Sequence, residues 1–152
     1  PNSGKSSLLN TLTNSNVKTG NYNFTTLFPN LGVLPNRKII ADIPGIIEGA
    51  ADGKGLGIKF LKHIQKVKLL LHCVSADSSN PMEDYKKVRQ ELEKYDPNMT
   101  IKDEVILLTK HDLLTDNIVK KIKQALQKLG REIVVTSIYD MGSIENILKI
   151  LK

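Results

Sequence analysis

The sequence predicts an α/β domain with a mostly parallel sheet and helices on both of its faces. The prediction depends on three strand-then-helix pairs in the second half of the chain: 69–74 with 82–95, 104–108 with 115–129, and 133–135 with 143–151. Such alternation is typical of parallel sheets, whose strands are joined by crossover helices. Two earlier runs, 31–34 and 38–41, flank the turn residues Pro35-Asn36 and predict a hairpin.

The composition fits one globular domain. The 152 residues are 40% hydrophobic and 25% charged, which supplies one sizeable core and leaves no room for a second domain. The apolar run 67–74 is interrupted by Lys68 and His72 and is far shorter than the ~20 residues of a membrane span. A single cysteine, Cys73, excludes an internal disulfide framework. We therefore expect a soluble, monomeric protein of a reducing compartment, the cytoplasm.

The net charge of +6 favours an anionic partner. Aromatic residues make up only 5% of the chain, however, so no stacking platform for single-stranded nucleic acid is visible. Two interpretations stay open: a surface that contacts nucleic acid, and a lysine-rich surface that is simply solvated. The basic residues to which both interpretations apply lie on the helix predicted within 113–130: Lys120, Lys121, Lys123 and Lys128.

The first six residues carry most of a phosphate-binding loop. Pro1-Asn2-Ser3-Gly4-Lys5-Ser6 reads as the end of G-x-x-x-x-G-K-[ST], and the first glycine would lie upstream of Pro1. In such a loop backbone amides surround the α- and β-phosphates, the lysine reaches the β- and γ-phosphates, and the hydroxyl binds Mg²⁺. Gly4, Lys5 and Ser6 hold these positions. We predict a P-loop NTPase fold, with its first strand missing from this chain.

A helix and a long polar stretch follow the loop. Residues 5–13 predict a helix that starts at the phosphates, because Leu8, Leu9 and Leu12 share one face. Residues 13–29 are rich in Asn, Thr and Gly and longer than an ordinary connection, so we interpret them as a functional loop. After a glycine-rich segment, apolar residues predict a further helix: Ile58, Phe60, Leu61 and Ile64.

Two motifs at strand ends extend the phosphate site. Asp42-Ile43-Pro44-Gly45 follows the hairpin, where a Mg²⁺-linked carboxylate and a glycine amide that senses the γ-phosphate are needed. Thr109-Lys110-His111-Asp112 ends the strand predicted at 104–108. The Asp112 carboxylate can accept two hydrogen bonds from the guanine N1–H and exocyclic amine, a pair of donors that adenine lacks. Taken singly, Asp112 could instead cap a helix and Gly45 could make a turn.

A third motif, Ser137-Ile138-Tyr139, follows the strand at 133–135, where backbone amides can meet the guanine O6. Together, in this order and each at a strand end, the motifs predict a guanine-nucleotide-binding domain. None of the three histidines has metal-ligand spacing. We expect His72 to pack in a strand and His111 to point outward, and we assign no catalytic role to either or to His63.

These motifs, with two further segments, resemble the Obg family. The segments are Asn21-Tyr22-Asn23-Phe24-Thr25-Thr26-Leu27-Phe28-Pro29-Asn30-Leu31-Gly32 and residues 42–50 with Gly53-Lys54-Gly55-Leu56-Gly57. The resemblance spans nearly all 152 residues and is confined to that family's central GTPase domain. It implies a GTPase of the ribosome-assembly class that binds the large ribosomal subunit.

The resemblance also implies roles for individual residues. It makes Ser6 and Thr26 the Mg²⁺ ligands and residues 24–28, Phe24-Thr25-Thr26-Leu27-Phe28, the first switch, and it starts a second switch at 42–45. Related GTPases hold K⁺ beside the phosphates with an asparagine at the place of Asn2, so K⁺ is a further candidate cofactor. The residues expected to act in hydrolysis are Lys5, Thr26, Gly45 and Asn2.

The chain departs from the family pattern at three places. Thr109 stands where the family usually has Asn, and its hydroxyl is expected to bridge the base and phosphate loops instead. Ile138 is bulkier than the usual Ala. Ile46 takes the place of the Gln with which many GTPases orient water, so we expect slow turnover. A module that senses nucleotide state and binds the ribosome, with incidental hydrolysis, is the alternative. An ATP-using relative is opposed by Asp112 and Thr25.

Overall fold

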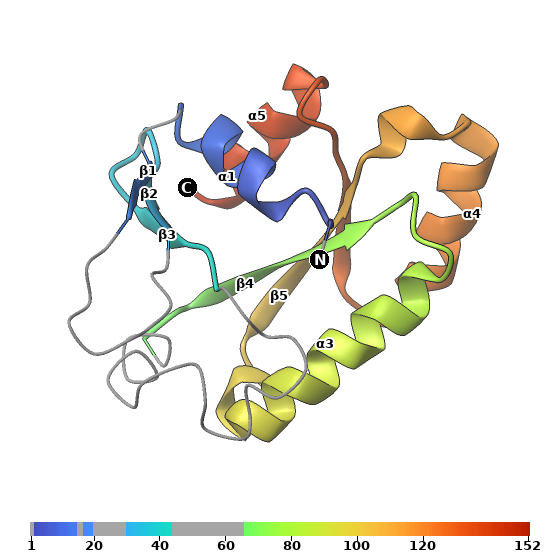
Figure 1. The fold of residues 1–152 in the computed structure, drawn as a ribbon, viewed down its shortest axis with the longest axis horizontal. Coiled ribbons are helices and arrows are strands. Elements are labelled where there is room, and N and C mark those ends of the chain that lie inside the picture. The colour runs from blue at the N-terminus through green and yellow to red at the C-terminus, as the bar shows by residue number, and fades with distance from the viewer. Residues whose placement is uncertain (1, 15–16, 20–29, 44–65) are drawn as a thin grey trace.

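The computed structural model describes residues 2–14, 17–19, 30–43 and 66–152. Within these ranges both the helices and the strands follow the order that the sequence predicts (Figure 1). The elements are α1 (Lys5–Leu12), β1 (Val17–Thr19), β2 (Asn30–Val33), β3 (Ile39–Ala41), β4 (Leu69–Ser75), α3 (Pro81–Tyr95), η2 (Pro97–Met99), β5 (Asp103–Thr109), η3 (His111–Leu113), α4 (Asp116–Gln127), β6 (Glu132–Val135) and α5 (Met141–Ile150). The helix expected around 58–64 lies outside the described residues.

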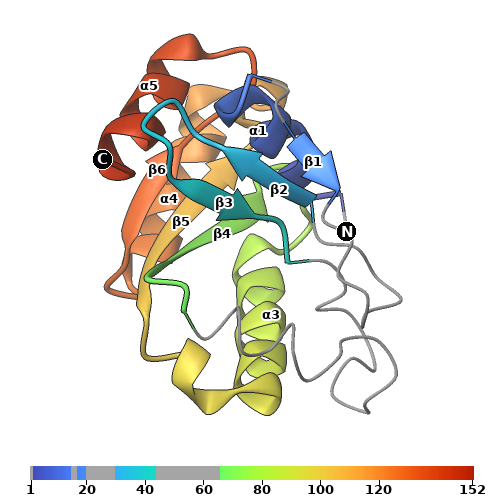
Figure 2. The same ribbon diagram turned by 90° about the vertical axis from the view of Figure 1, so that its left-hand side faces the viewer.

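The second half of the chain forms the predicted parallel sheet. Strands β4, β5 and β6 are neighbours in that order, with Leu71 opposite Val105 and Leu107 opposite Val134. Helices α1 and α5 cover one face, and α3 lies on the opposite side (Figure 2). The α/β class with helices on both faces is therefore confirmed.

Alternation along β5 explains why both faces are covered. Val105 and Leu107 pack with α1 and α5, whereas Ile106 and Leu108 pack with α3 and α4. All four side chains are almost fully buried. A strand apolar on both faces can be stable only between two helical layers.

The predicted hairpin is also present. β2 and β3 are antiparallel, with Gly32 opposite Ile40. A Cβ added to Gly32 would lie only 2.3 Å from Thr13 Cγ2, so this position requires glycine because α1 ends against the strand. The third strand of this sheet, β1, was not predicted, because three residues, Val-Lys-Thr, are too few to show a period within the polar stretch.

The single sheet expected from the sequence is divided in the described residues. Strands β1 to β3 form one antiparallel sheet and β4 to β6 a separate parallel one, so β3 and β4 do not pair in this part of the chain.

The helix predicted at 115–129 is α4, which starts at Asp116 with Thr115 as its N-cap. Residues His111–Leu113 form the separate turn η3. The extended backbone of Leu114 (φ −129°, ψ 160°) separates η3 from α4. The interruption leaves residues 109–113 as a loop at the carboxyl end of β5.

Within the described ranges, no helix is both long enough and apolar enough to cross a membrane. Cys73 lies in β4 against the core shared with α1. Burial raises the pKa of its thiol to about 12, so the thiol stays protonated as a packing group.

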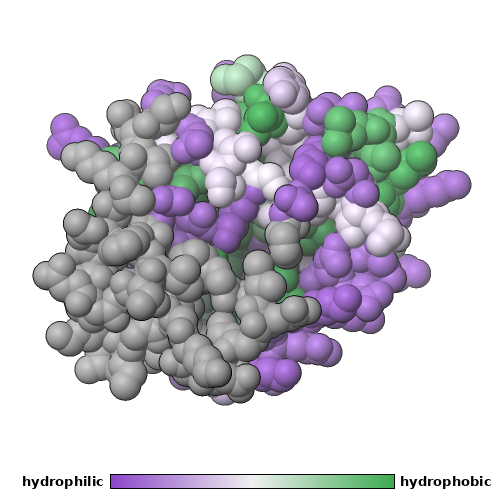
Figure 3. All heavy atoms as spheres, viewed as in Figure 1, coloured by the Kyte–Doolittle hydropathy of each residue, from purple (hydrophilic) through white to green (hydrophobic). Residues whose placement is uncertain are grey.

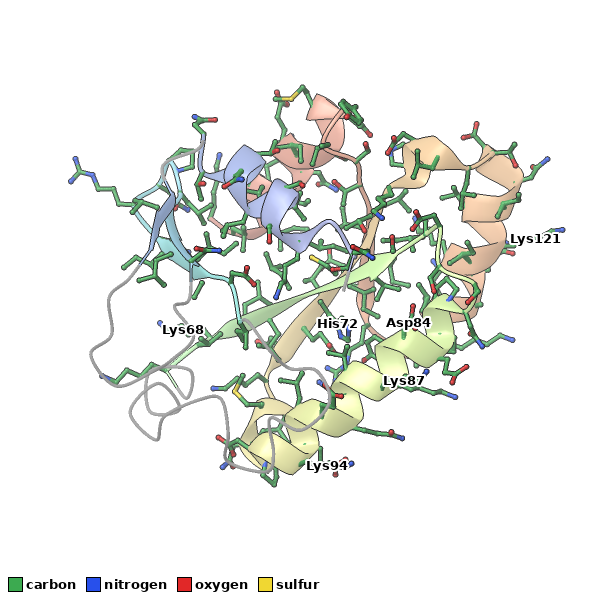
Figure 4. The ribbon with its side chains drawn as sticks, in the orientation of Figure 1. Lys68, His72, Asp84, Lys87, Lys94 and Lys121 are labelled. Atoms are coloured by element: carbon green, nitrogen blue, oxygen red, sulfur yellow. The ribbon has the colours of Figure 1, made fainter. Side chains whose placement is uncertain are left out.

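A buried acidic residue holds α3 to the sheet on the opposite face. Glu104, with a fully buried side chain, accepts a hydrogen bond from the Tyr85 hydroxyl at 2.9 Å and lies 2.9 Å from His72 Nδ1. Arg89 lies 3.3 Å from the same carboxylate. His72 is located between β4 and α3 (Figure 4), and its ring stacks on Tyr85. Burial opposes the charge on Glu104, but the hydrogen bond and charge of His72 hold its pKa below the usual value.

We predict that Glu104→Gln lowers the free energy of unfolding at neutral pH by about 3–5 kcal/mol. The substitution removes the negative charge that balances the basic side chains buried around it. A depressed folded-state pKa stabilises the protein above the unfolded value of 4.5 and less as pH falls below it. The difference between wild type and variant should therefore shrink in acid. Urea unfolding at several pH values measures it. Asp103→Asn, at the exposed start of the same strand, is the control, and equal stability of Glu104→Gln and wild type would refute the role.

Candidate functional site

The candidate site lies at the carboxyl ends of the parallel strands. Residues 2–6, 109–112 and 137–139 all approach this edge, because β4, β5 and β6 run in the same direction. Ser3 lies beside the end of β5, because its carbonyl accepts a hydrogen bond from the Thr109 hydroxyl. Ligands of open α/β sheets bind at this edge. Three of the four predicted motifs therefore come together as expected.

The phosphate loop turns twice into the left-handed region before α1. Asn2 has φ 60° and Gly4 has φ 77°, and Gly4 caps the helix. The backbone amides of Lys5, Ser6 and Ser7 donate to no residue in the described ranges. A helix N-terminus with free amides is a favourable place for an anion, because the amides and the helix dipole both attract negative charge.

Thr109 joins the phosphate loop to the base-reading motif. Its hydroxyl, buried at the end of β5, donates to the Ser3 carbonyl at 2.6 Å. The expected bridge between the two loops is therefore present with Thr in place of Asn. The Lys110 side chain extends the contact, since its Cε lies 3.9 Å from where a Cβ on Gly4 would stand. Lys110 itself has φ 58°, which turns the chain out of the strand.

Lys5 connects the phosphate loop to the end of the hairpin sheet. Its ammonium lies 2.5 Å from the Asp42 carboxylate and donates to the Ile43 carbonyl at 2.8 Å. Asp42 is 8% exposed and its amide donates to the Asn30 carbonyl, so the strand end fixes the carboxylate. The Lys5 ammonium is thus paired with the Asp42 carboxylate, and a phosphate can replace that carboxylate as its partner.

Of the two predicted Mg²⁺ ligands, the structure describes Ser6 and not Thr26, and the carboxylate predicted to be linked to the ion, Asp42, is also described. Ser6 is exposed at the first turn of α1, and its hydroxyl has no hydrogen-bond partner among the described residues. The buried Asp42 carboxylate lies beside Lys5, the residue before Ser6. These are the hard oxygen donors that Mg²⁺ prefers alongside phosphates. No cluster of three His, Cys, Asp or Glu residues is present in the same ranges.

The base-reading loops present one free acceptor and one free donor. The exposed Asp112 carboxylate forms no hydrogen bond or ion pair with any described residue. In the loop after β6, the amides of Ser137, Tyr139 and Asp140 donate to Ser143 Oγ, Ser137 Oγ and the Ser137 carbonyl. The Ile138 amide is left without a partner in the described part of the chain. The pattern matches a base that has an N1–H and an exocyclic amine as donors and a carbonyl oxygen as acceptor.

The side chain of Ile138 does not crowd this loop. Ile138 is 37% exposed, and the neighbouring Tyr139 is 80% exposed. Other apolar side chains, Leu113 and Ile118, are exposed near the start of α4, where Figure 3 shows apolar surface beside the hydrophilic surface over α3.

The expectation that His111 points outward is wrong. Its side chain is 27% exposed, and Nε2 lies 3.4 Å from Asp140 Oδ2. The η3 turn directs the ring toward the N-terminus of α5, where Asp140 is the cap.

Two acidic residues of the site were missed. Asp77 lies 3.3 Å from the Lys110 ammonium, and a hydrogen bond from the Ser75 hydroxyl together with Lys110 lowers its pKa. Asp140 faces His111. Both follow parallel strands by a few residues, so their place after a strand was the available signal.

Several predicted site residues lie outside the described residues, and their roles stay predictions. They are Pro1, the first switch with Phe24, Thr25, Thr26, Leu27 and Phe28, and from the second switch Pro44, Gly45 and Ile46.

Comparisons with known proteins agree with this arrangement. The family described as 50S ribosome-binding GTPase matches residues 1–110. The GTPase Obg of Prochlorococcus marinus is 45% identical over 142 residues, which cover 90% of this chain and 43% of that protein. The GTPase Obg of Pelagibacter ubique is 46% identical over 151 residues, covering 97% and 46%. The chain thus spans a little under half the length of these curated relatives.

Solved structures share the fold. The structure of an S. thermophilus NFeoB mutant bound to GDP has a TM-score of 0.70 and 25% identity, covering 98% of this chain and 57% of that one. The G domain of the T. maritima FeoB iron transporter has a TM-score of 0.61 and 24% identity, covering 91% and 83%. The fold is that of the P-loop GTPases.

Proposed function

This chain belongs to the 50S ribosome-binding GTPase family, and we propose that it binds guanine nucleotides with Mg²⁺ and hydrolyses GTP slowly to GDP and phosphate. Its role is that of a switch in assembly of the large ribosomal subunit, which assigns it to the cytoplasm. The observation that carries the proposal is the hydrogen bond from the Thr109 hydroxyl to the Ser3 carbonyl at 2.6 Å. It fixes a phosphate loop and a base-reading loop at one spacing.

When a nucleotide binds, the phosphates replace Asp42 as the partner of Lys5. Its ammonium leaves the Asp42 carboxylate and pairs with the β- and γ-phosphates, while the amides of α1 hold the same phosphates. Ser6 and Thr26 would hold Mg²⁺, which neutralises phosphate charge when it is bound. Asp42, no longer paired with Lys5, would supply the carboxylate near that ion. Gly45 would offer its amide to the γ-phosphate.

Guanine is selected by two groups with opposite hydrogen-bonding character. Asp112 accepts from N1–H and the exocyclic amine, and the Ile138 amide donates to O6. Adenine presents an amine where guanine has O6 and has no N1–H, so it would leave both protein groups unpaired. An unpaired polar group costs about 1–3 kcal/mol, and a charged one costs more. An ATP-using function is disfavoured on this ground.

Hydrolysis depends on the orientation of water next to the γ-phosphate. Ile46 follows Gly45 and cannot hydrogen-bond water, so intrinsic turnover is slow. Asn2 supports a further role for K⁺: it is exposed and left-handed, and its amide group has no hydrogen-bond partner among the residues described. An Asn side-chain oxygen there can hold the ion beside the phosphates, where its charge would stabilise the transition state.

The alternative is a ribosome-binding module that senses nucleotide state and hydrolyses GTP only incidentally. The slow turnover expected from Ile46 is compatible with both functions. The net charge of +6 supports a ribosomal partner in either case.

We predict that Asp112→Asn weakens GDP binding at least about a hundredfold, because it removes two charge-assisted hydrogen bonds worth about 1.5–3 kcal/mol each. Displacement of a fluorescent GDP in the presence of Mg²⁺ measures the affinity, with ATP as competitor. Asp116→Asn changes an exposed acid four residues away and should bind like wild type. Equal GDP affinity in all three proteins would refute the assignment of the base.

For K⁺ we expect about tenfold faster GTP turnover than in Na⁺ at equal ionic strength, equivalent to about 1.4 kcal/mol of transition-state stabilisation. Asn2→Ala should lose the K⁺ advantage and keep the Na⁺ rate. Asn10→Ala, an exposed asparagine on α1, serves as the matched control. If the two salts give wild type the same rate, K⁺ has no role, and GDP binding is unaffected by that result.

The two functions are separated by multiple-turnover GTPase assays with purified large ribosomal subunits. For a timed switch, subunits should raise turnover at least about tenfold, and the rise should diminish with salt because phosphate contacts are screened. Binding of subunits that requires GTP but leaves turnover unchanged would favour the sensing module.

A further inference from the structure

The turn that follows β4 contacts the candidate site, although it belongs to none of the predicted motifs. Residues 75–78 lie at the same sheet edge as the loop after β5, because Ser75 stands opposite Thr109 in the parallel register. The Ala76 amide donates to the Thr109 carbonyl at 2.9 Å, and the Thr109 hydroxyl lies 3.3 Å from the Val74 carbonyl. The end of β4 therefore holds the residue that bridges the phosphate loop and the base-reading loop.

Within this turn, two contacts fix the Asp77 carboxylate. The Ser75 hydroxyl donates to Asp77 Oδ1. The Lys110 ammonium donates to Asp77 Oδ2 at 3.3 Å and lies 3.5 Å from Oδ1. The hydrogen bond from Ser75 and the charge of Lys110 both lower the pKa of Asp77, so the carboxylate is ionised at neutral pH. The contact with Lys110 is thus both an ion pair and a hydrogen bond.

The side chain of Lys110 is held at both of its ends. The backbone turns out of β5 with φ 58°, and the ammonium is held by Asp77. Between these two points the stem lies alongside the phosphate loop, because its Cγ and Cε atoms are 4.0 Å and 3.9 Å from where a Cβ on Gly4 would stand. Gly4 caps α1 in the left-handed conformation. The stem therefore lies beside the residue at which the anion-attracting end of α1 begins.

Such a fixed stem favours ligand binding. A free lysine side chain has many rotamers, and immobilising it when a ligand binds costs free energy. The contact between Asp77 and Lys110 is made within the protein alone, so the ligand does not have to order the stem. A side chain that orders Lys110 in this way can raise the affinity for a nucleotide without contacting it.

We propose that Asp77 is a positioning residue for the nucleotide: it holds Lys110 alongside Gly4 and so pre-orders the junction between the phosphate loop and the base-reading loop. The inference rests on the proposed guanine-nucleotide function. It adds the turn at 75–78 as a further loop of the site, which acts through Lys110. Because both side chains are partly exposed, solvent screens the pair, and the expected effect on GDP affinity is about two- to fivefold.

The test is the dissociation constant of a fluorescent GDP with Mg²⁺ for wild type and a set of variants. Asp77→Asn keeps the size of the side chain and removes its charge, so binding should weaken about two- to fivefold. Asp77→Glu keeps the charge and should retain most of the wild-type affinity. Lys110→Met keeps an unbranched stem and removes the ammonium. In the Lys110→Met background, Asp77→Asn should cause no further loss, because the partner of the carboxylate is already gone.

Asp84→Asn is the matched control. Asp84 lies near the start of α3 (Figure 4) and accepts a hydrogen bond from the Ser78 hydroxyl of the same turn, but it does not pair with Lys110. This variant should therefore bind GDP like wild type. An effect that came only from a disturbed turn would weaken binding in Asp84→Asn as well, and it would persist in the Lys110→Met background.

Either of those two results overturns the inference, and so does equal GDP affinity of Asp77→Asn and wild type. Absence of GDP binding by wild type would instead overturn the proposed function.

Discussion

The candidate site depends on the hydrogen bond from the Thr109 hydroxyl to the Ser3 carbonyl. It is the direct hydrogen bond between the loop before α1 and the end of β5. Its geometry is set far from the loops themselves, since β5 is buried on both faces and cannot shift without disturbing two cores. The spacing between the loop before α1 and the loop after β5 is therefore set by the packed sheet. The positions of the two loops follow from the position of β5.

Electrostatics follow a common pattern around this anchor. Lys5 faces Asp42, Lys110 faces Asp77, and His111 faces Asp140. Each of these basic side chains thus faces a carboxylate on a different segment. Under the proposed function, an incoming nucleotide would compete with the first of these pairs. Asp112, by contrast, has no partner in the described residues, which leaves it free for the proposed contact with the base.

The sequence was sufficient for the elements whose pattern is local. The strand-helix alternation, the hairpin turn at Pro35-Asn36 and the start of α1 at Lys5 all follow from periodicity or turn chemistry, and the structure confirms them. The start of α4 at Asp116 also lies within one residue of the helix predicted at 115–129. β1 was missed because its short run gains its hydrogen bonds only from the edge of β2.

For the site, motif positions could be predicted but their cross-connections could not. Thr109 was expected to bridge the loops because its hydroxyl can replace an amide. Asp140 and Asp77 act through partners 29 and 33 positions away, and no local spacing signals such a contact. The first switch rests on the family resemblance and Gly45 on its motif, since both lie outside the described residues.

The burial of Cys73 has a practical chemical consequence. The raised pKa of its thiol keeps the thiolate, which is the reactive species, scarce at neutral pH. Alkylating reagents and air oxidation should therefore spare the native protein. Any modification of Cys73 would report how often β4 separates from the helix that covers it, which makes this side chain a built-in probe of local opening.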